Sequence, residues 1–108
     1  MERVELSLNS YLGFWYNLTL HVDPDTCILY KTNDSNKKVP CTSITDLVHI
    51  TGATISSFYR FYREASAKKY IASINFNVKN KYYILNPMFV SNESEATIST
   101  LFSKKMAV

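Results

Sequence analysis

The sequence contains little glycine, proline or cysteine: two, three and two residues out of 108. Phosphate-binding loops place glycines within a few residues of one another, and Gly13 and Gly52 lie far apart. Cys27 and Cys41 are too few for a disulfide framework, and no zinc-binding spacing links them to the two histidines. We therefore expect no metal and no cofactor.

Long apolar runs are also missing. No stretch of about 18 uncharged apolar residues occurs, and the first residues, MERVE, lead into no apolar segment with a cleavage site. The sequence thus predicts neither a membrane span nor a signal peptide, and we expect a cytoplasmic protein whose cysteines stay thiols. Paired carboxylates occur only in loop or capping contexts, so we expect no enzymatic activity.

Apolar and aromatic residues are abundant, at 46% and 14% of the chain. This composition favours a packed core over disorder, and the length fits a single domain over residues 1–108. The formal net charge is +3, and positive charge concentrates in residues 54–81, whereas residues 1–36 are acidic. A basic face of this kind attracts phosphate, anionic lipid or an acidic partner.

Apolar periodicity predicts a first helix from a cap at Ser7 to near Val22, with Leu8, Leu12 and Trp15 at helical spacing. Alternating apolar residues over 18–22 allow a strand there as the alternative. A short apolar run predicts a buried strand at 27–30, and residues 37–39 fit a returning strand.

The next segment predicts two helices joined by a tight turn. Ser43 is a suitable cap for a short helix that ends near Gly52, and Thr54 is a suitable cap for a longer one. In the second helix, Phe58, Phe61, Tyr62 and Ala65 share an apolar side, and Ser56, Tyr59, Arg60 and Arg63 lie largely on the other side. Two helices with a glycine-containing turn form a helix-turn-helix.

Beyond residue 69 the apolar period falls from 3.6 to about 2. Runs at 70–76 and 81–85 predict a hairpin with a polar tip at 77–80. A final helix is expected at 92–105, where Glu93 and Glu95 in the first turn and Lys104 and Lys105 in the last turn suit the helix dipole.

The segment 43–61, SITDLVHITGATISSFYRF, resembles the winged helix-turn-helix of bacterial regulators and replication proteins through Leu47, Gly52, Phe58 and Phe61. The YYILNP run at 82–87, followed by the last predicted helix, is similar to small winged-helix proteins of plasmids and phages of Gram-positive bacteria. The resemblance implies an α+β fold with a three-helix core. The helix-turn-helix would span 43–70, the hairpin wing 70–86 and the C-terminal helix 92–105.

The resemblance also implies sequence-specific binding of double-stranded DNA by a small transcriptional regulator or replication accessory protein. Helix 54–69 would enter the major groove and the basic hairpin would lie on the backbone. Arg60 is the residue expected to contact a base edge, and the lysines are expected to contact phosphates. The implied DNA-binding residues are Thr54, Ile55, Ser56, Tyr59, Arg60, Arg63, Lys68, Lys69, Lys79 and Lys81.

An alternative is that the same fold docks on a host or partner protein through its aromatic helix. Tyrosine and arginine are favoured at protein interfaces too, and Ile55 and Tyr59 favour this alternative. Helix-turn-helix proteins commonly bind DNA as dimers. The expected homodimer surface combines the first and last helices, through Tyr11, Leu12, Trp15, Leu101 and Phe102.

Overall fold

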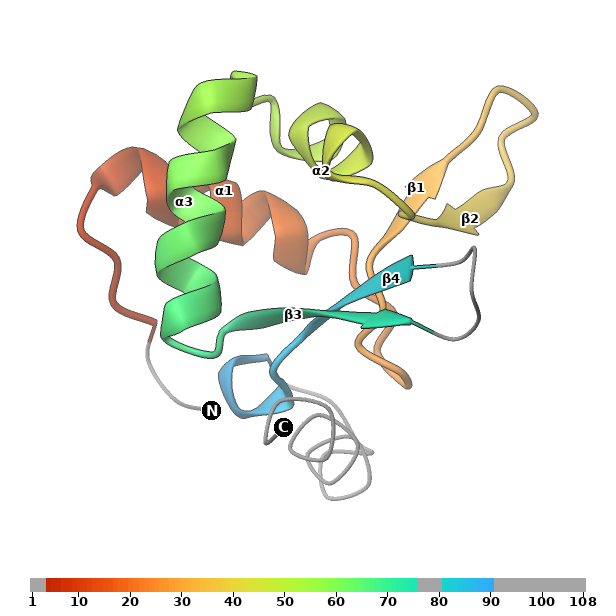
Figure 1. Ribbon diagram of the computed structural model, residues 1–108. Helices are drawn as coiled ribbons and strands as arrows, with labels where there is room; N and C mark the ends of the chain where they lie inside the picture. The colour runs from red at the N-terminus through yellow and green to blue at the C-terminus, as the bar shows by residue number, and fades with distance from the viewer. Residues whose placement is uncertain (1–3, 76–80, 91–108) are drawn as a thin grey trace.

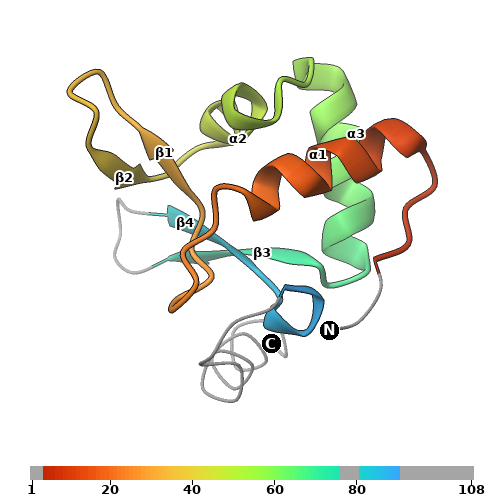
Figure 2. The same ribbon diagram turned by 180° about the vertical axis from the view of Figure 1, so that it is seen from behind.

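The computed structural model describes residues 4–75 and 81–90, which form an α+β globule. In chain order its elements are α1 (Asn9–Thr19), β1 (Tyr30–Thr32), β2 (Lys38–Pro40), α2 (Ile44–Thr51), α3 (Ile55–Ala67), β3 (Ile71–Asn75), β4 (Lys81–Leu85) and a 3-10 turn, η1 (Pro87–Phe89). Helix α3 crosses in front of α1 in Figure 1, and α1 crosses in front of α3 in the reverse view of Figure 2. The strands pair as two antiparallel hairpins, β1–β2 and β3–β4.

The first helix is shorter than the sequence predicts. Helix α1 begins two residues after the expected cap, with Leu8 as its N-cap, and ends at its C-cap Leu20 without reaching Val22. Ser7 does not cap it, because its backbone N–H and its hydroxyl both donate hydrogen bonds to the Glu64 carboxylate, at 2.8 and 2.5 Å. Within residues 18–22, the predicted helix is therefore confirmed only for Leu18 and Thr19.

The strand predicted at 27–30 is displaced to 30–32, and its partner lies at 38–40. The cause is a tight turn before it, in which the Asp23 carboxylate accepts hydrogen bonds from the N–H groups of Asp25 and Thr26, at 2.8 and 3.0 Å. The turn leaves Cys27 in the left-handed region with φ of 59°. Regular pairing of the hairpin therefore starts later than the apolar pattern indicates.

Residues 27–29 nevertheless lie in an extended segment beside β4. The Leu29 N–H donates to the Tyr83 carbonyl at 2.8 Å, and the Leu85 N–H donates to the Cys27 carbonyl at 3.0 Å. Ile28 forms an antiparallel bridge to the same strand. Strand β4 thus has this segment on one side and β3 on the other.

The predictions for helices and strands within 43–70 and 70–86 are confirmed where the structure describes them. Helices α2 and α3 are separated by three residues, and β3 pairs with β4 in antiparallel register over all five residues of each strand. Asn86 ends β4 as predicted, and its side-chain oxygen accepts a hydrogen bond from the Met88 N–H at 3.0 Å.

The core lies where α1, α3 and the β3–β4 hairpin meet. Phe61 is fully buried, and its ring centroid is 5.5 Å from that of Phe58 and 5.7 Å from those of Tyr11 and Phe14. The same core contains Trp15, Leu18, Leu29, Leu47, Ala65, Tyr70, Ile71, Tyr83 and Leu85. Burial of Phe58, Phe61 and Ala65 along one side of α3 fixes which side of this helix faces solvent.

The predicted dimer surface is wrong for two of its residues. Tyr11 and Trp15 are each only 7% exposed, because their rings pack against Phe61 and Tyr70 in the core. Leu12, the next residue along from Tyr11, points away and is 41% exposed. The inner side of α1 therefore belongs to the monomer.

Some predictions fall outside the described residues. They are the hairpin tip at 77–80, which includes Lys79, and the helix at 92–105, which includes Leu101 and Phe102. Within residues 4–75 and 81–90, none of the helices has the length and apolarity needed to cross a bilayer.

Gly52→Ala is expected to lower the free energy of unfolding by about 1 kcal/mol, because residue 52 has a left-handed φ of 70° that an L-residue adopts only with strain. An added Cβ would meet nothing within 4 Å, so no steric clash contributes. Gly13→Ala inside α1 is the matched control, and it should stabilise by up to about 1 kcal/mol. Urea denaturation measures the free energy of unfolding of both variants. If the two substitutions change it in the same direction, this account is contradicted.

Candidate nucleic-acid interface

Two capped helices and a three-residue turn position α3. The Ser43 hydroxyl accepts a hydrogen bond from the Asp46 N–H at 3.2 Å, and the Thr54 hydroxyl accepts one from the Ser57 N–H at 3.3 Å. Between them Gly52 ends α2 in the left-handed conformation. Both caps and the turn agree with the sequence prediction.

Helix α3 exposes one side along its whole length. All six residues that the resemblance assigns to the groove-facing side of this helix are exposed: Thr54, Ile55, Ser56, Tyr59, Arg60 and Arg63. Their exposure follows from the burial of Phe58 and Phe61 on the opposite side. The structure thus presents two hydroxyls, two guanidinium groups and two large apolar side chains together.

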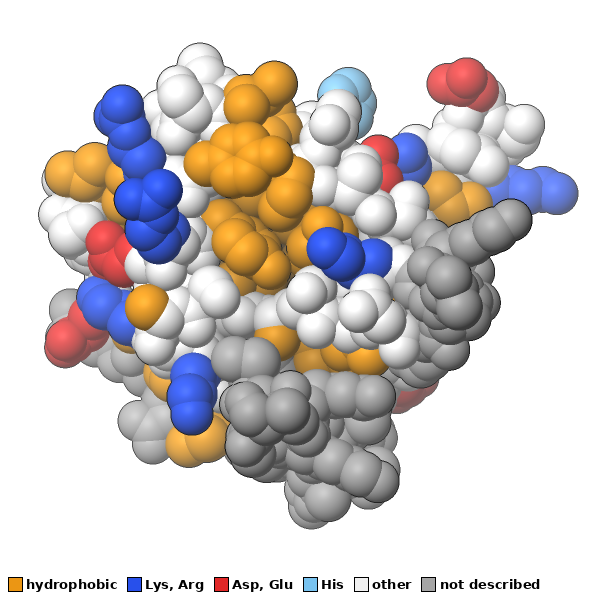
Figure 3. Space-filling view, viewed as in Figure 1, with side chains coloured by type: hydrophobic (Ala, Val, Ile, Leu, Met, Phe, Trp, Pro, Cys, Tyr) orange, Lys and Arg blue, Asp and Glu red, His pale blue; other side chains and the backbone are white. Residues whose placement is uncertain are grey.

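Ile55 and Tyr59 on this side form an apolar line with Tyr62, which the sequence predicts on the buried side and which is only partly buried; we call these three residues the α3 stripe. Ile55 is 58% exposed and Tyr59 is 52% exposed. Tyr62 is half-buried, with its ring 6.2 Å from the Tyr83 ring at an interplanar angle of 86°. Burial raises the pKa of Tyr83 to about 12. Figure 3 shows apolar side chains in a band over this part of the molecule, with basic side chains on both sides of it.

The basic residues predicted to contact DNA differ in availability. Arg60 and Arg63 are exposed, and neither belongs to the ion pairs formed among the residues that the structure describes. Lys81 is exposed at the start of β4, and Lys69 is exposed in the turn between α3 and β3, where its φ is 62°. These four side chains can reach an external anion without leaving an internal carboxylate.

Lys68 is exposed but is already engaged. Its ammonium group donates hydrogen bonds to the Glu64 carboxylate at 3.0 Å and to the Glu5 carbonyl at 2.8 Å. Hydrogen bonds from Ser7 and Lys68 lower the pKa of Glu64. These contacts tie the N-terminal segment to α3, a role that the sequence did not reveal.

A second tie missed by sequence analysis joins the β1–β2 hairpin to α2. The Lys31 ammonium donates to the Asp46 carboxylate at 2.6 Å, and the Thr42 N–H donates to the same carboxylate at 3.0 Å. Burial tends to raise the pKa of Asp46, but the hydrogen bonds from Lys31 and Thr42 outweigh it, and the pKa is lowered. No local signal connects residues 31 and 46, because their meeting depends on how the hairpin folds.

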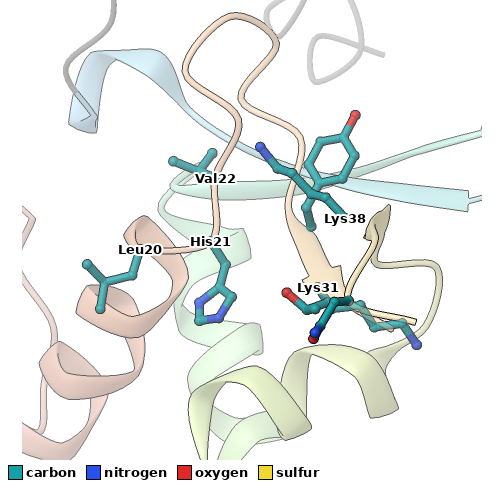
Figure 4. A pocket seen from close by; sticks show the side chains of 8 residues that line it. Leu20, His21, Val22, Lys31 and Lys38 are labelled. Atoms are coloured by element: carbon teal, nitrogen blue, oxygen red, sulfur yellow. The ribbon is translucent and has the colours of Figure 1, made fainter. Parts of the chain in front are cut away.

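A hollow of about 210 Å³ lies between the end of α1 and the β1–β2 hairpin (Figure 4). Lys31 and Lys38 line it, and both have partners: Lys31 pairs with Asp46, and Lys38 lies 3.8 Å from the Asp23 carboxylate and 4.9 Å from the Tyr30 ring centroid. The hollow therefore has cationic walls whose charge is largely compensated.

Both cysteines are buried in the core. Burial is the main cause that raises the pKa of Cys27 to about 11 and that of Cys41 to about 12, so little thiolate forms at neutral pH. Within residues 4–75 and 81–90, no three side chains of His, Cys, Asp or Glu gather closely enough to hold a metal ion.

Comparison with protein-family models, with curated proteins and with solved structures finds no match for this chain. A functional assignment therefore depends on the geometry of the chain itself. The exposed side of α3 and the basic residues beside it are the arrangement to explain.

Asp46→Asn should destabilise the fold by about 1 to 2 kcal/mol at neutral pH, because it removes the charge that pairs with Lys31. The folded-state pKa of Asp46 is lowered, so its contribution is full above about pH 4 and is lost as pH falls through the folded-state pKa. Urea denaturation at pH 7 and near pH 3 measures the stability of the wild-type protein and of the Asp46→Asn variant at each pH.

The wild-type protein and the Asp46→Asn variant should become closer in stability at the lower pH. Asp34→Asn, a change at an exposed loop carboxylate, is the control and should alter stability by less than about 0.5 kcal/mol. A stability difference between the wild-type protein and the Asp46→Asn variant that is independent of pH would contradict the account.

Proposed function

We propose that this chain is a winged-helix domain that binds double-stranded DNA, as a small transcriptional regulator or replication accessory protein. The element order is compatible with this fold: helix α1, an extended segment at 27–29, the β1–β2 hairpin, helices α2 and α3, then strands β3 and β4, with 27–29 beside β4. In the proposed fold, α3 is the recognition helix.

The observation that carries the proposal is the exposed side of α3 with its two available arginines. A helix of this width fits the major groove, and residues near its N-terminus face base edges. In this proposal the exposed Arg60 donates two hydrogen bonds to a guanine, and the hydroxyls of Thr54 and Ser56 suit bases or phosphates. Ile55 offers an apolar contact for a thymine methyl group.

Lysines around α3 supply the phosphate contacts in this proposal. Lys69 directly follows the helix, Lys81 begins β4 opposite Asn75 at the other end of the hairpin, and Lys79 in the hairpin tip is assigned from the sequence alone. Lys68 would first have to leave Glu64 and the Glu5 carbonyl. We therefore expect Lys68 to contribute less to binding than Lys69 or Lys81.

Titration with duplex DNA at several salt concentrations tests the proposal. If about five phosphates are neutralised, log K should fall against log salt with a slope of roughly −4 to −5. Arg60→Ala should reduce discrimination between sequences by about 1 to 3 kcal/mol. Lys81→Ala should weaken binding to all sequences alike and make the slope shallower by about 1.

Lys37→Ala is the charge-matched control for that experiment. Lys37 is exposed in the loop between β1 and β2, so its removal should leave affinity and slope nearly unchanged. A slope near zero, or equal losses from Lys37→Ala and Lys81→Ala, would remove DNA from the proposal.

A second candidate function is docking on a host or partner protein through α3. The observation that favours it is the exposure of Ile55 and Tyr59, since solvent-exposed tyrosine beside an aliphatic residue is common at protein interfaces. Tyr59→Ala should then abolish capture of a specific protein from the source cell, and Arg60→Ala and Lys81→Ala should leave DNA binding unchanged. The reverse pattern supports DNA binding.

A further inference from the structure

The outer side of α1 carries an exposed apolar row, Leu8, Leu12, Tyr16 and Leu20, which we call the α1 ridge. These side chains are 51%, 41%, 62% and 61% exposed. They are four residues apart and so follow one line along the helix, with Leu8 and Leu20 at its two caps. An exposed apolar row of this kind is a candidate interaction surface.

A shallow row lies next to the ridge on the same helix. It consists of Asn9 and Gly13, which are also four residues apart, and it ends at Asn17, which is half-buried because its side-chain amide donates a hydrogen bond to the Thr51 carbonyl at 3.0 Å. A Cβ at Gly13 would meet nothing within 4 Å, so the space over this residue is open. Helix α1 and both its caps carry no charged side chain.

We propose that the α1 ridge is the contact surface for a second copy of this chain, with the two α1 helices crossing antiparallel about a two-fold axis. Ridges formed by residues four apart pack into the matching grooves of another helix at a crossing angle of about −50°. In this pair the ridge of each copy lies against Asn9 and Gly13 of the other. A ridge with no charge fits an uncharged surface, which its own copy provides.

The spacing of the ridge fits two-fold symmetry. In an antiparallel pair centred on the middle of α1, Leu8 lies near Leu20 of the other copy, and Leu12 lies near Tyr16 of the other copy. Each residue of the ridge thus lies near a ridge residue of the other copy, and the contacts are reciprocal, as they are in an isologous interface. The glycine in the groove lets the two helices approach closely at the centre.

The position of α1 leaves α3 accessible in such a dimer. The two helices lie on opposite sides of the molecule in Figures 1 and 2. The inference does not depend on the proposed function. A standard interface buries about 800 Å² on each partner, more than four half-exposed side chains supply, so we expect a reversible dimer in the micromolar range.

Sedimentation velocity of the full chain from about 1 μM to about 1 mM tests the proposal. The wild-type chain should change from monomer to dimer within this range. Leu12→Lys and Tyr16→Lys should each raise the dimer Kd by at least about tenfold. Ile55→Lys is the matched control, because Ile55 is similarly exposed, at 58%, but lies on α3. The dimer Kd of this variant should stay within about twofold of the wild-type value.

Gly13→Gln provides a variant that spares the monomer. The open space at residue 13 and the higher helix propensity of glutamine should preserve or raise thermal stability, and the filled groove should raise the dimer Kd by about tenfold or more. A wild-type chain that stays monomeric throughout overturns the proposal, whether another protein or residues 91–108 cover the ridge. The proposal is also overturned if the wild-type chain dimerises but Ile55→Lys dissociates the dimer whereas Leu12→Lys leaves it intact.

Discussion

The packing of Phe61 determines what α3 presents to solvent. Its ring is fully buried, and the rings of Tyr11, Phe14 and Phe58 surround it at centroid distances of 5.5 to 5.7 Å. Rotating α3 about its axis by one residue, about 100°, would expose this ring and lose several kcal/mol of apolar burial. The rotation of the helix is therefore fixed, and with it the outward position of Arg60.

Hydrogen-bonded ties at the periphery hold the flanking segments against this aromatic core. Glu64 accepts hydrogen bonds from Ser7 and Lys68, and Asp46 accepts them from Lys31 and from the backbone of Thr42. Each tie also compensates a lysine. Among the described residues of 54–81, the positive charge that remains available lies on Arg60, Arg63, Lys69 and Lys81, because Lys68 pairs with Glu64.

Features encoded by neighbouring residues could be predicted from the sequence. The caps at Ser43 and Thr54, the turn at Gly52 and the buried side of α3 each depend on a few adjacent positions. Contacts between distant residues could not, such as that of Ser7 with Glu64 or of residues 27–29 with β4. Helix α1 shows a further limit of pattern analysis. Its inner and outer sides are both apolar, so periodicity alone could not tell Tyr11 from Leu12.

The two exposed apolar rows differ in their surroundings, and this difference favours different partners. The α3 stripe lies beside two arginines, so a partner there must offer negative charge as well as apolar contact, as the thymine methyls and phosphates of DNA do. The α1 ridge has no charged neighbour on its helix, which disfavours a polyanion and suits a second copy. Pairing through α1 would place two α3 helices in a fixed, symmetric relation. That relation would set the spacing of DNA half-sites, because dimeric readers bind successive turns of one face of the duplex.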